Sequence, residues 1–160
     1  MKQISLFLIL FTCITGSGCG KDEPSNTDAG SGTITAKVNG QNWSSKNTAD
    51  GAIYGESQGA HLITGQADDG SYISLSLPVA ISSGQTYSAA DGSLSAQYKP
   101  TLSGTISYIA VGGLGSGSVT FSEFSDKKVK GTFRFTGVLV DQNGIQEELQ
   151  IENGAFDFNL

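Results

Sequence analysis

The sequence predicts an all-β domain, an antiparallel β-sandwich or small β-barrel built from about nine to ten short strands. Gly, Ser and Thr together exceed one third of the residues, and only 15% are charged, which is a poor composition for helices. From residue 33 onward the apolar residues alternate with a period of two, as in half-buried strands. Turn sequences containing Gly recur between these runs. A helical bundle and a coiled coil are therefore excluded.

The first predicted hairpin turns at Asn39-Gly40, the dipeptide that most strongly favours a two-residue turn with both residues at positive φ. The residues before the turn alternate from Ile34 to Val38. A two-residue turn then places Trp43, the only Trp of the chain, on the same face as Ile34 and Val38. We expect Trp43 to pack in the core, and stacking on a sugar ring is the alternative.

The second predicted hairpin joins residues 61–67 to residues 71–77 through the three-residue loop 68–70, with Gly70 in the left-handed conformation. Pro78 ends its second strand. The pairs that this register predicts are Ile63 with Leu75, Gly65 with Ile73, and His61 with Leu77. His61 is the only His, and on an apolar face without a second His or Cys it is expected to be structural and not catalytic.

The remaining strands are predicted from shorter sequence patterns. Asp91-Gly92 predicts a turn, and the Gly-rich stretch 112–117 predicts a flexible loop. An odd-length loop around residues 125–128 would bring Val119, Phe121, Phe133 and Phe135 onto one face. The strands expected here cover residues 86–87, 94–99, 101–111, 118–124, 129–140 and 145–160.

The last predicted strand contains a change of phase. Its apolar residues occupy odd positions up to Ile151 and even positions from Phe156. The change falls at Asn153-Gly154, which predicts a β-bulge or, alternatively, one more tight turn. The alternation in residues 156–160 is also typical of the closing strand of a transmembrane β-barrel, but the many polar outward positions argue against that fold.

The N-terminus has the features of a signal peptide. Lys2 supplies a positive charge, residues 4–14 are mostly apolar, and small residues occupy positions 16–18. The apolar run is too short to span a bilayer, which takes about 20 residues. We therefore assign residues 1–18 to a signal peptide.

Cys19 follows the small residues directly and resembles the acylated cysteine of bacterial lipoproteins. The next residues, Lys21, Asp22 and Glu23, resemble the export signal of lipoproteins that reach the outer face of the outer membrane. Residues 19–32 then form an acylated, disordered tether, and residues 33–160 form a single antiparallel β domain. These features predict an outer-membrane, lipid-anchored protein on the cell surface, with anchoring at the periplasmic face as the alternative.

Several function classes are disfavoured by the composition. Both Cys residues, Cys13 and Cys19, lie at or before the expected cleavage site, so the domain has no disulfide and no metal-binding thiol. The net charge of −6 argues against nucleic acid as a partner. Neither a nucleophile-elbow sequence nor an EF-hand loop occurs, and Asp68-Asp69-Gly70 is expected to be a turn. We expect no enzyme activity, no cofactor and no bound metal.

Three stretches in this order, residues 36–43, 129–135 and 151–157, resemble a family of small, uncharacterised, β-rich bacterial lipoproteins. The resemblance covers most of residues 33–160, and it implies the fold and the location but no catalytic residue. Two functions remain. The first is a membrane-anchored binding or accessory module that contacts a glycan or protein through exposed Tyr and loop residues. The alternative is a lipocalin-like carrier with a hollow interior.

Overall fold

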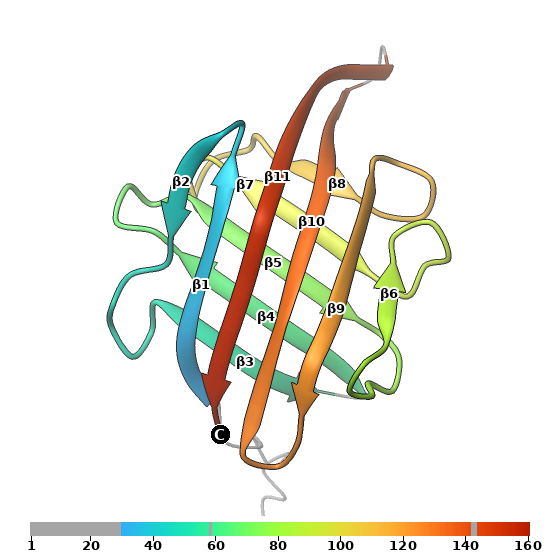
Figure 1. Ribbon diagram of the computed structural model, residues 1–160. Coiled ribbons are helices and arrows are strands. Elements are labelled where there is room, and N and C mark those ends of the chain that lie inside the picture. The colour runs from blue at the N-terminus through green and yellow to red at the C-terminus, as the bar shows by residue number, and fades with distance from the viewer. Residues whose placement is uncertain (1–29, 58, 142–143) are drawn as a thin grey trace, which may run out of the picture.

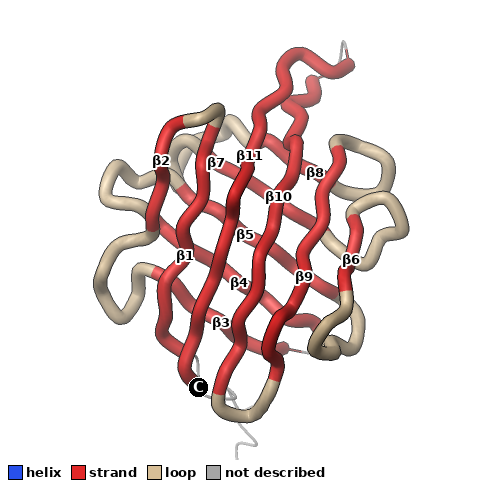
Figure 2. The backbone as a smooth tube through the Cα atoms, viewed as in Figure 1, coloured by secondary structure: helices blue, strands red, loops and turns tan. Residues whose placement is uncertain are grey.

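The computed structural model describes residues 30–57, 59–141 and 144–160, and within these ranges the chain forms antiparallel strands and no helix that could span a membrane (Figures 1 and 2). The predicted all-β fold is confirmed, with eleven strands instead of nine or ten. The strands are β1 (Gly30–Val38), β2 (Gln41–Ser44), β3 (Ala52–Ser57), β4 (Ala60–Gln66), β5 (Tyr72–Leu77), β6 (Thr86–Ser88), β7 (Ser95–Lys99), β8 (Tyr108–Ala110), β9 (Ser116–Phe124), β10 (Lys128–Asp141) and β11 (Gly144–Asn159).

The strand pairings close a ring in the order β11-β1-β3-β4-β5-β7-β8-β10, because β10 also pairs with β11. The ring is flattened into two layers (Figure 1). The front sheet contains β2, β1, β11, β10, β9 and β6, and the back sheet contains β3, β4, β5, β7 and β8, whose strands cross those of the front sheet at a steep angle. The layers join where Gly30 pairs with Tyr54 and where Val138 pairs with Ile109. The architecture is thus a barrel with the cross-section of a sandwich.

The first hairpin has the predicted register. Ala36 pairs with Trp43, and the turn residues Asn39 and Gly40 have φ values of 47° and 81°. Trp43 is buried beside Ile34. The prediction that Trp43 packs in the core is confirmed, and sugar stacking is excluded because only 8% of its surface is exposed.

The second hairpin also has the predicted register, with Ile63 opposite Leu75 and His61 opposite Leu77. Its three-residue loop ends at Gly70, which has a φ of 83°. The Asp69 carboxylate accepts hydrogen bonds from the backbone N–H and the hydroxyl of Ser71, at 2.9 and 2.6 Å. The same arrangement links Asp91 and Ser93 in the later turn.

In the hairpin between β9 and β10, the predicted side chains share one face, but a bulge and not an odd-length loop brings them there. Its loop has the even length of residues 125–128, since Phe124 pairs with Val129. A bulge at Ser122 supplies the one-residue shift that an odd-length loop would have given. The four side chains predicted to share the core face are buried there: Val119, Phe121, Phe133 and Phe135.

The phase change in β11 is a β-bulge, as predicted, and not a turn. The pairing with β10 skips from Gly154 to Ile151, and the pairing with β1 skips from Ala155 to Glu152. Asn153 adopts the left-handed conformation with a φ of 51°. The extra residue lets apolar side chains on both sides of the bulge face the core.

Strand β3 is absent from the sequence-based prediction. It pairs along its whole length with β4, and Tyr54 points into the core. The alternation is weak here because Ala52 is small, Ile53 lies on the opposite face, and the next residue in phase with Tyr54 is the exposed Glu56.

The predicted strand at residues 101–111 is wrong except for β8. Residues before Tyr108 form turns, in which the Gly104 N–H donates to the Thr101 carbonyl at 3.0 Å. The Leu102 N–H donates to the Gly70 carbonyl at 3.0 Å, which fixes this segment against the β4–β5 loop. The β-branched composition of the segment was a misleading signal, because Ser and Gly set its turns.

The Gly-rich stretch after β8, which predicts a flexible loop, instead forms a tight turn followed by the start of β9. Gly112 and Gly113 both have positive φ, and Val111 and Leu114 exchange two backbone hydrogen bonds at 2.8 and 2.9 Å. β9 therefore starts at Ser116, two residues before the expected position.

β1 begins at Gly30 and not at residue 33, so the end of the expected tether is part of the sheet. A Cβ on Gly32 would lie 2.2 Å from the Asp157 carbonyl oxygen. Glycine is needed here for the close approach of β1 to β11, although the local composition resembles that of a linker.

The interior is filled by side chains that meet across the two sheets. Tyr54 of the back sheet lies 6.3 Å from Phe158 of the front sheet, measured between ring centroids. The ring centroids of His61 in the back sheet and Phe124 in the front sheet lie 5.4 Å apart. At the other end, the Trp43 Nε1–H donates to the Ser71 hydroxyl at 2.7 Å.

Candidate functional site

The site residues predicted at the N-terminus lie outside the described residues. These are the lipidation site Cys19 and the export-signal residues Lys21, Asp22 and Glu23. The structure therefore bears only on the β domain and its surfaces.

A concave surface lies on the outer face of the front sheet. Three hollows of about 490, 540 and 350 Å³ adjoin one another there. Arg134 lines the first two, and Asn153 lines the second and third. We call this continuous surface the front groove. It crosses six strands from β6 to β2, which corresponds to about 24 Å at the usual strand spacing of about 4.8 Å.

Hydroxyl and amide side chains dominate the front groove. They point outward because they alternate with the buried residues of the same strands. Among the residues that the structure describes, the charged side chains lining it are Lys37, Arg134 and Glu152. The hydroxyl and amide residues are Thr35, Asn42, Ser44, Thr86, Ser88, Ser116, Ser118, Thr120, Thr132, Thr136, Gln150 and Asn153.

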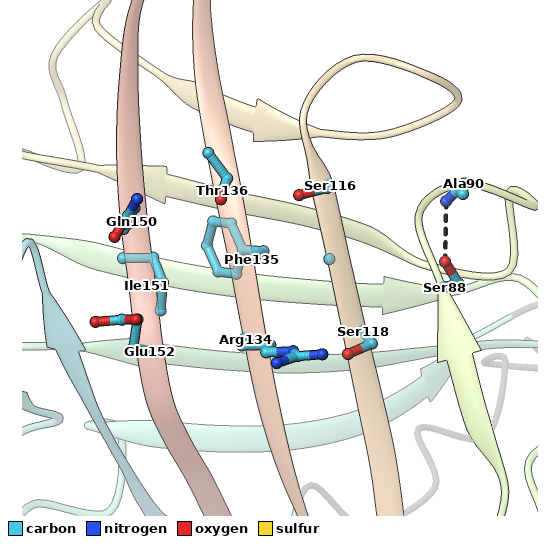
Figure 3. Close-up of a pocket in the computed structure, with 11 residues that line it drawn as sticks. Ser88, Ala90, Ser116, Ser118, Arg134, Phe135, Thr136, Gln150, Ile151 and Glu152 are labelled. Atoms are coloured by element: carbon cyan, nitrogen blue, oxygen red, sulfur yellow. Dashed lines mark hydrogen bonds between the residues drawn. The ribbon is translucent and has the colours of Figure 1, made fainter.

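Arg134 occupies the middle of the front groove and is the only Arg in the chain. Figure 3 shows its side chain extending from β10 toward Ser118 on β9, whereas the Glu152 carboxylate on β11 is directed away from it. Within the described residues Arg134 forms no ion pair. The guanidinium is therefore free to bind an oxyanion from solution.

The bulge of β11 shapes this region. Arg134 lies opposite the extra residue, because its neighbours Phe133 and Phe135 pair with Gly154 and Ile151. The bulge turns Asn153 to the outer surface between two of the hollows. Sequence reasoning missed the groove because no compact motif marks it. The available signal was Arg134 at an outward position among Thr and Ser residues.

Two other cationic residues of β10 are already paired. The Asp157 carboxylate contacts the Lys128 Nζ at 2.7 Å and the Lys130 Nζ at 3.3 Å. The hydrogen bond from Lys128 and the proximity of Lys130 lower the pKa of Asp157. Arg134 thus differs from the other outward cations of its own strand.

A second polar group surrounds His61 at the edge of the core. The Tyr54 hydroxyl and the His61 Nδ1 lie 2.8 Å apart, and the Glu56 Oε2 lies 3.8 Å from the same nitrogen. Burial lowers the pKa of His61, and the Glu56 charge opposes this effect. Burial, assisted by Glu56, raises the pKa of Tyr54 to about 12. This geometry holds His61 neutral and hydrogen-bonded inside the core, as expected for a structural His.

The carboxylates of β11 do not converge. Glu147, Glu148 and Glu152 are exposed, and Glu147 accepts a hydrogen bond from the Tyr108 hydroxyl at 2.8 Å. In the ranges that the structure describes, no three His, Cys, Asp or Glu side chains gather as they would around a metal ion.

The exposed tyrosines that the sequence analysis expected at a binding surface are not found. Tyr54, Tyr98 and Tyr108 are buried, and Tyr72 and Tyr87 are half-buried. Three of the five Tyr side chains therefore belong to the core.

Comparison with known proteins identifies a family. Residues 30–158 match the family described as a domain of unknown function, DUF6252. The chain belongs to this family. The match includes all eleven strands of the DUF6252 domain and stops at Phe158, one residue before the end of β11. The predicted resemblance to an uncharacterised β-rich family is thereby confirmed at that level. No curated protein and no solved structure matches the chain significantly.

Proposed function

We propose that this DUF6252 protein is a bacterial, membrane-anchored lipoprotein whose β domain is a non-enzymatic binding module, with the front groove as its binding surface. The observation that carries the proposal is the contrast between the interior of the domain and one of its outer faces. The interior is occupied by packed aromatic and aliphatic side chains, whereas one outer face carries a continuous polar groove with a free Arg134.

The packed interior favours a binding module over a lipocalin-like carrier. A carrier needs an enclosed apolar cavity, but rings from opposite sheets pack against each other inside this barrel, as Tyr54 and Phe158 do. The front groove, in contrast, opens on a side wall of the barrel.

The placement of β1 supports a tethered arrangement. Strand β1 begins at the same end of the barrel as the C-terminus, because Ser31 pairs with Asn159 (Figure 1). The front groove crosses the strands on the outer face of the front sheet, so it does not lie at this end of the barrel. A tether leaving from residue 30 toward Cys19 would leave the groove open to a ligand. Lipidation at Cys19 and export directed by residues 21–23 would place the groove on the cell surface.

Site-specific photo-crosslinking in cells that make the full chain tests the groove. A photoreactive residue at Thr132, which lies in the groove on β10, should capture a glycan or protein partner. The matched control is Ser76, on the outer face of the back sheet, where the neighbouring Leu75 and Leu77 are buried. Equal capture from both positions, or capture from Ser76 alone, would contradict the proposal.

A further inference from the structure

We infer that the front groove binds a carboxylate-bearing glycan and that Arg134 is the residue that binds the carboxylate. This inference rests on the proposed function and adds the chemical class of the ligand. Its first support is the state of Arg134. It is exposed, it forms no ion pair among the described residues, and its strand neighbours Lys128 and Lys130 are both held by Asp157.

The charge around Arg134 favours an anion locally, although the chain as a whole has a net charge of −6. The groove is lined by two cationic side chains, Lys37 and Arg134, and one anionic side chain, Glu152. Figure 3 shows Glu152 pointing away from Arg134. A planar guanidinium flanked by the Ser118 hydroxyl matches a carboxylate, which accepts two parallel hydrogen bonds from Arg and can accept another from a hydroxyl.

The rest of the groove favours a sugar chain over a peptide. The Phe133, Phe135 and Ile151 side chains that border it are buried in the core, so no large apolar side chain is available to an apolar residue of a peptide. Hydroxyl and amide groups across β9, β10, β11 and β1 can instead exchange hydrogen bonds with successive sugar hydroxyls. The absence of an aromatic stacking surface among these lining residues means that the carboxylate contact has to supply much of the affinity.

The test compares an acidic oligosaccharide with its neutral methyl ester. The full chain, extracted from membranes in mild detergent, is titrated calorimetrically with oligogalacturonate and with the same oligomer fully methyl-esterified. A second uronate polymer, oligomannuronate, samples another stereochemistry. We expect a uronate to bind and its neutral ester to bind about tenfold or more weakly, as the loss of one charge-assisted hydrogen-bonded pair implies.

Variants at Arg134 separate the specific contact from general charge. Arg134→Gln should weaken uronate binding about tenfold. Arg134→Lys should bind uronate better than Arg134→Gln but less tightly than the parent, because Lys keeps the charge and lacks the planar fork. Lys127→Gln, in the β9–β10 turn, removes one positive charge outside the groove and should leave binding unchanged. Thermal unfolding should be the same for all three variants, since each position is exposed.

Four results would overturn the inference: equal binding of acid and ester, unchanged binding by Arg134→Gln, binding of polyglutamate in place of both uronates, or no binding of either uronate. If crosslinks still form at Thr132 in any of these cases, the groove is a binding surface for another class of ligand. If crosslinks at Thr132 are also missing, the proposed function fails as well.

Discussion

The indole Nε1–H of Trp43 donates a hydrogen bond of 2.7 Å to the hydroxyl of Ser71, which joins the front sheet to the start of the back-sheet strand β5. The Ser71 hydroxyl in turn donates to the Asp69 carboxylate at 2.6 Å. These contacts pair the polar atom of a buried aromatic residue with the turn of the second hairpin. The ring itself packs over Gly65, where a Cβ would lie 3.1 Å from it.

Trp43→Ala should lower the free energy of unfolding by about 3–5 kcal/mol, the usual cost of truncating a large core aromatic residue. Ser71→Ala should cost about 1–3 kcal/mol, because it leaves the indole N–H buried without a partner. Denaturant unfolding of the two variants measures both effects. A loss below about 1 kcal/mol for Trp43→Ala would show that this end of the core is not packed as described.

The bulge residue Asn153 offers a test of backbone geometry. Its φ of 51° is tolerated by Asn and Gly but is costly for a β-branched residue. Asn153→Val should therefore destabilise the domain by about 1–2 kcal/mol, whereas Asn153→Gly should be close to neutral. The comparison is made by urea unfolding. Equal stability of the two variants would indicate that residue 153 does not adopt the left-handed conformation.

Stability should depend on pH through His61. Burial lowers the pKa of His61 below its ordinary value of 6.5, so the unfolded chain binds a proton more readily than the folded domain does. The contribution of neutral His61 is therefore complete above pH 6.5 and is lost as the pH falls below that value. Asp69 and Asp157, whose pKa values are lowered from 3.8, weaken the fold only at more acidic pH.

His61→Phe should flatten the pH dependence of the unfolding free energy in the range just below about pH 6.5, where the carboxylates are still largely ionised. Tyr54→Phe serves as the control, because it removes the hydrogen bond to His61 but keeps the titrating imidazole. Chemical unfolding at a series of pH values gives the slopes. An unchanged slope in His61→Phe would mean that another group titrates in this window.

The parts of the fold that depend on local turn sequences could be predicted, and the parts that depend on pairs distant in the sequence could not. The registers of both early hairpins depend on local turn chemistry at Asn39-Gly40 and at Gly70, and both were predicted correctly. The closure of the ring depends on pairs distant in the sequence, such as Gly30 with Tyr54 and Val138 with Ile109. No local pattern specifies such pairs, so barrel and sandwich could not be distinguished.

The candidate site was less predictable than the fold. The front groove arises from outward residues of six strands brought together by the sheet, and its central residue Arg134 has no partner motif nearby in the sequence. The bulge opposite Arg134 was visible as a change of phase at Asn153, but its position beside Arg134 depends on the pairing of β10 with β11. At Gly112 and Gly113 a high Gly content predicts a flexible loop, but the chain forms a tight turn with two backbone hydrogen bonds between Val111 and Leu114.

The lipid anchor is tested at Cys19. Cys19→Ala should abolish incorporation of a fatty-acid analogue and release the protein from membranes or leave it unprocessed, because this thiol is the proposed acceptor. The β domain should still fold, since the described strands begin at Gly30. Continued lipid labelling of the variant would point to Cys13 or another acceptor and would overturn the assignment.

The central claim is that an anchored domain presents the front groove to the outside of the cell, and labelling of a single introduced thiol tests it most directly. The chain has no Cys after Cys19, so Thr132→Cys places a unique free thiol in the groove. Ala110→Cys, at a fully buried position of β8, is the unreactive control. On intact cells a membrane-impermeant maleimide should label Thr132→Cys, and replacing Lys21, Asp22 and Glu23 by Ala should abolish that labelling while the protein stays in the membrane fraction. Labelling of Thr132→Cys only after the outer membrane is permeabilised would contradict the account.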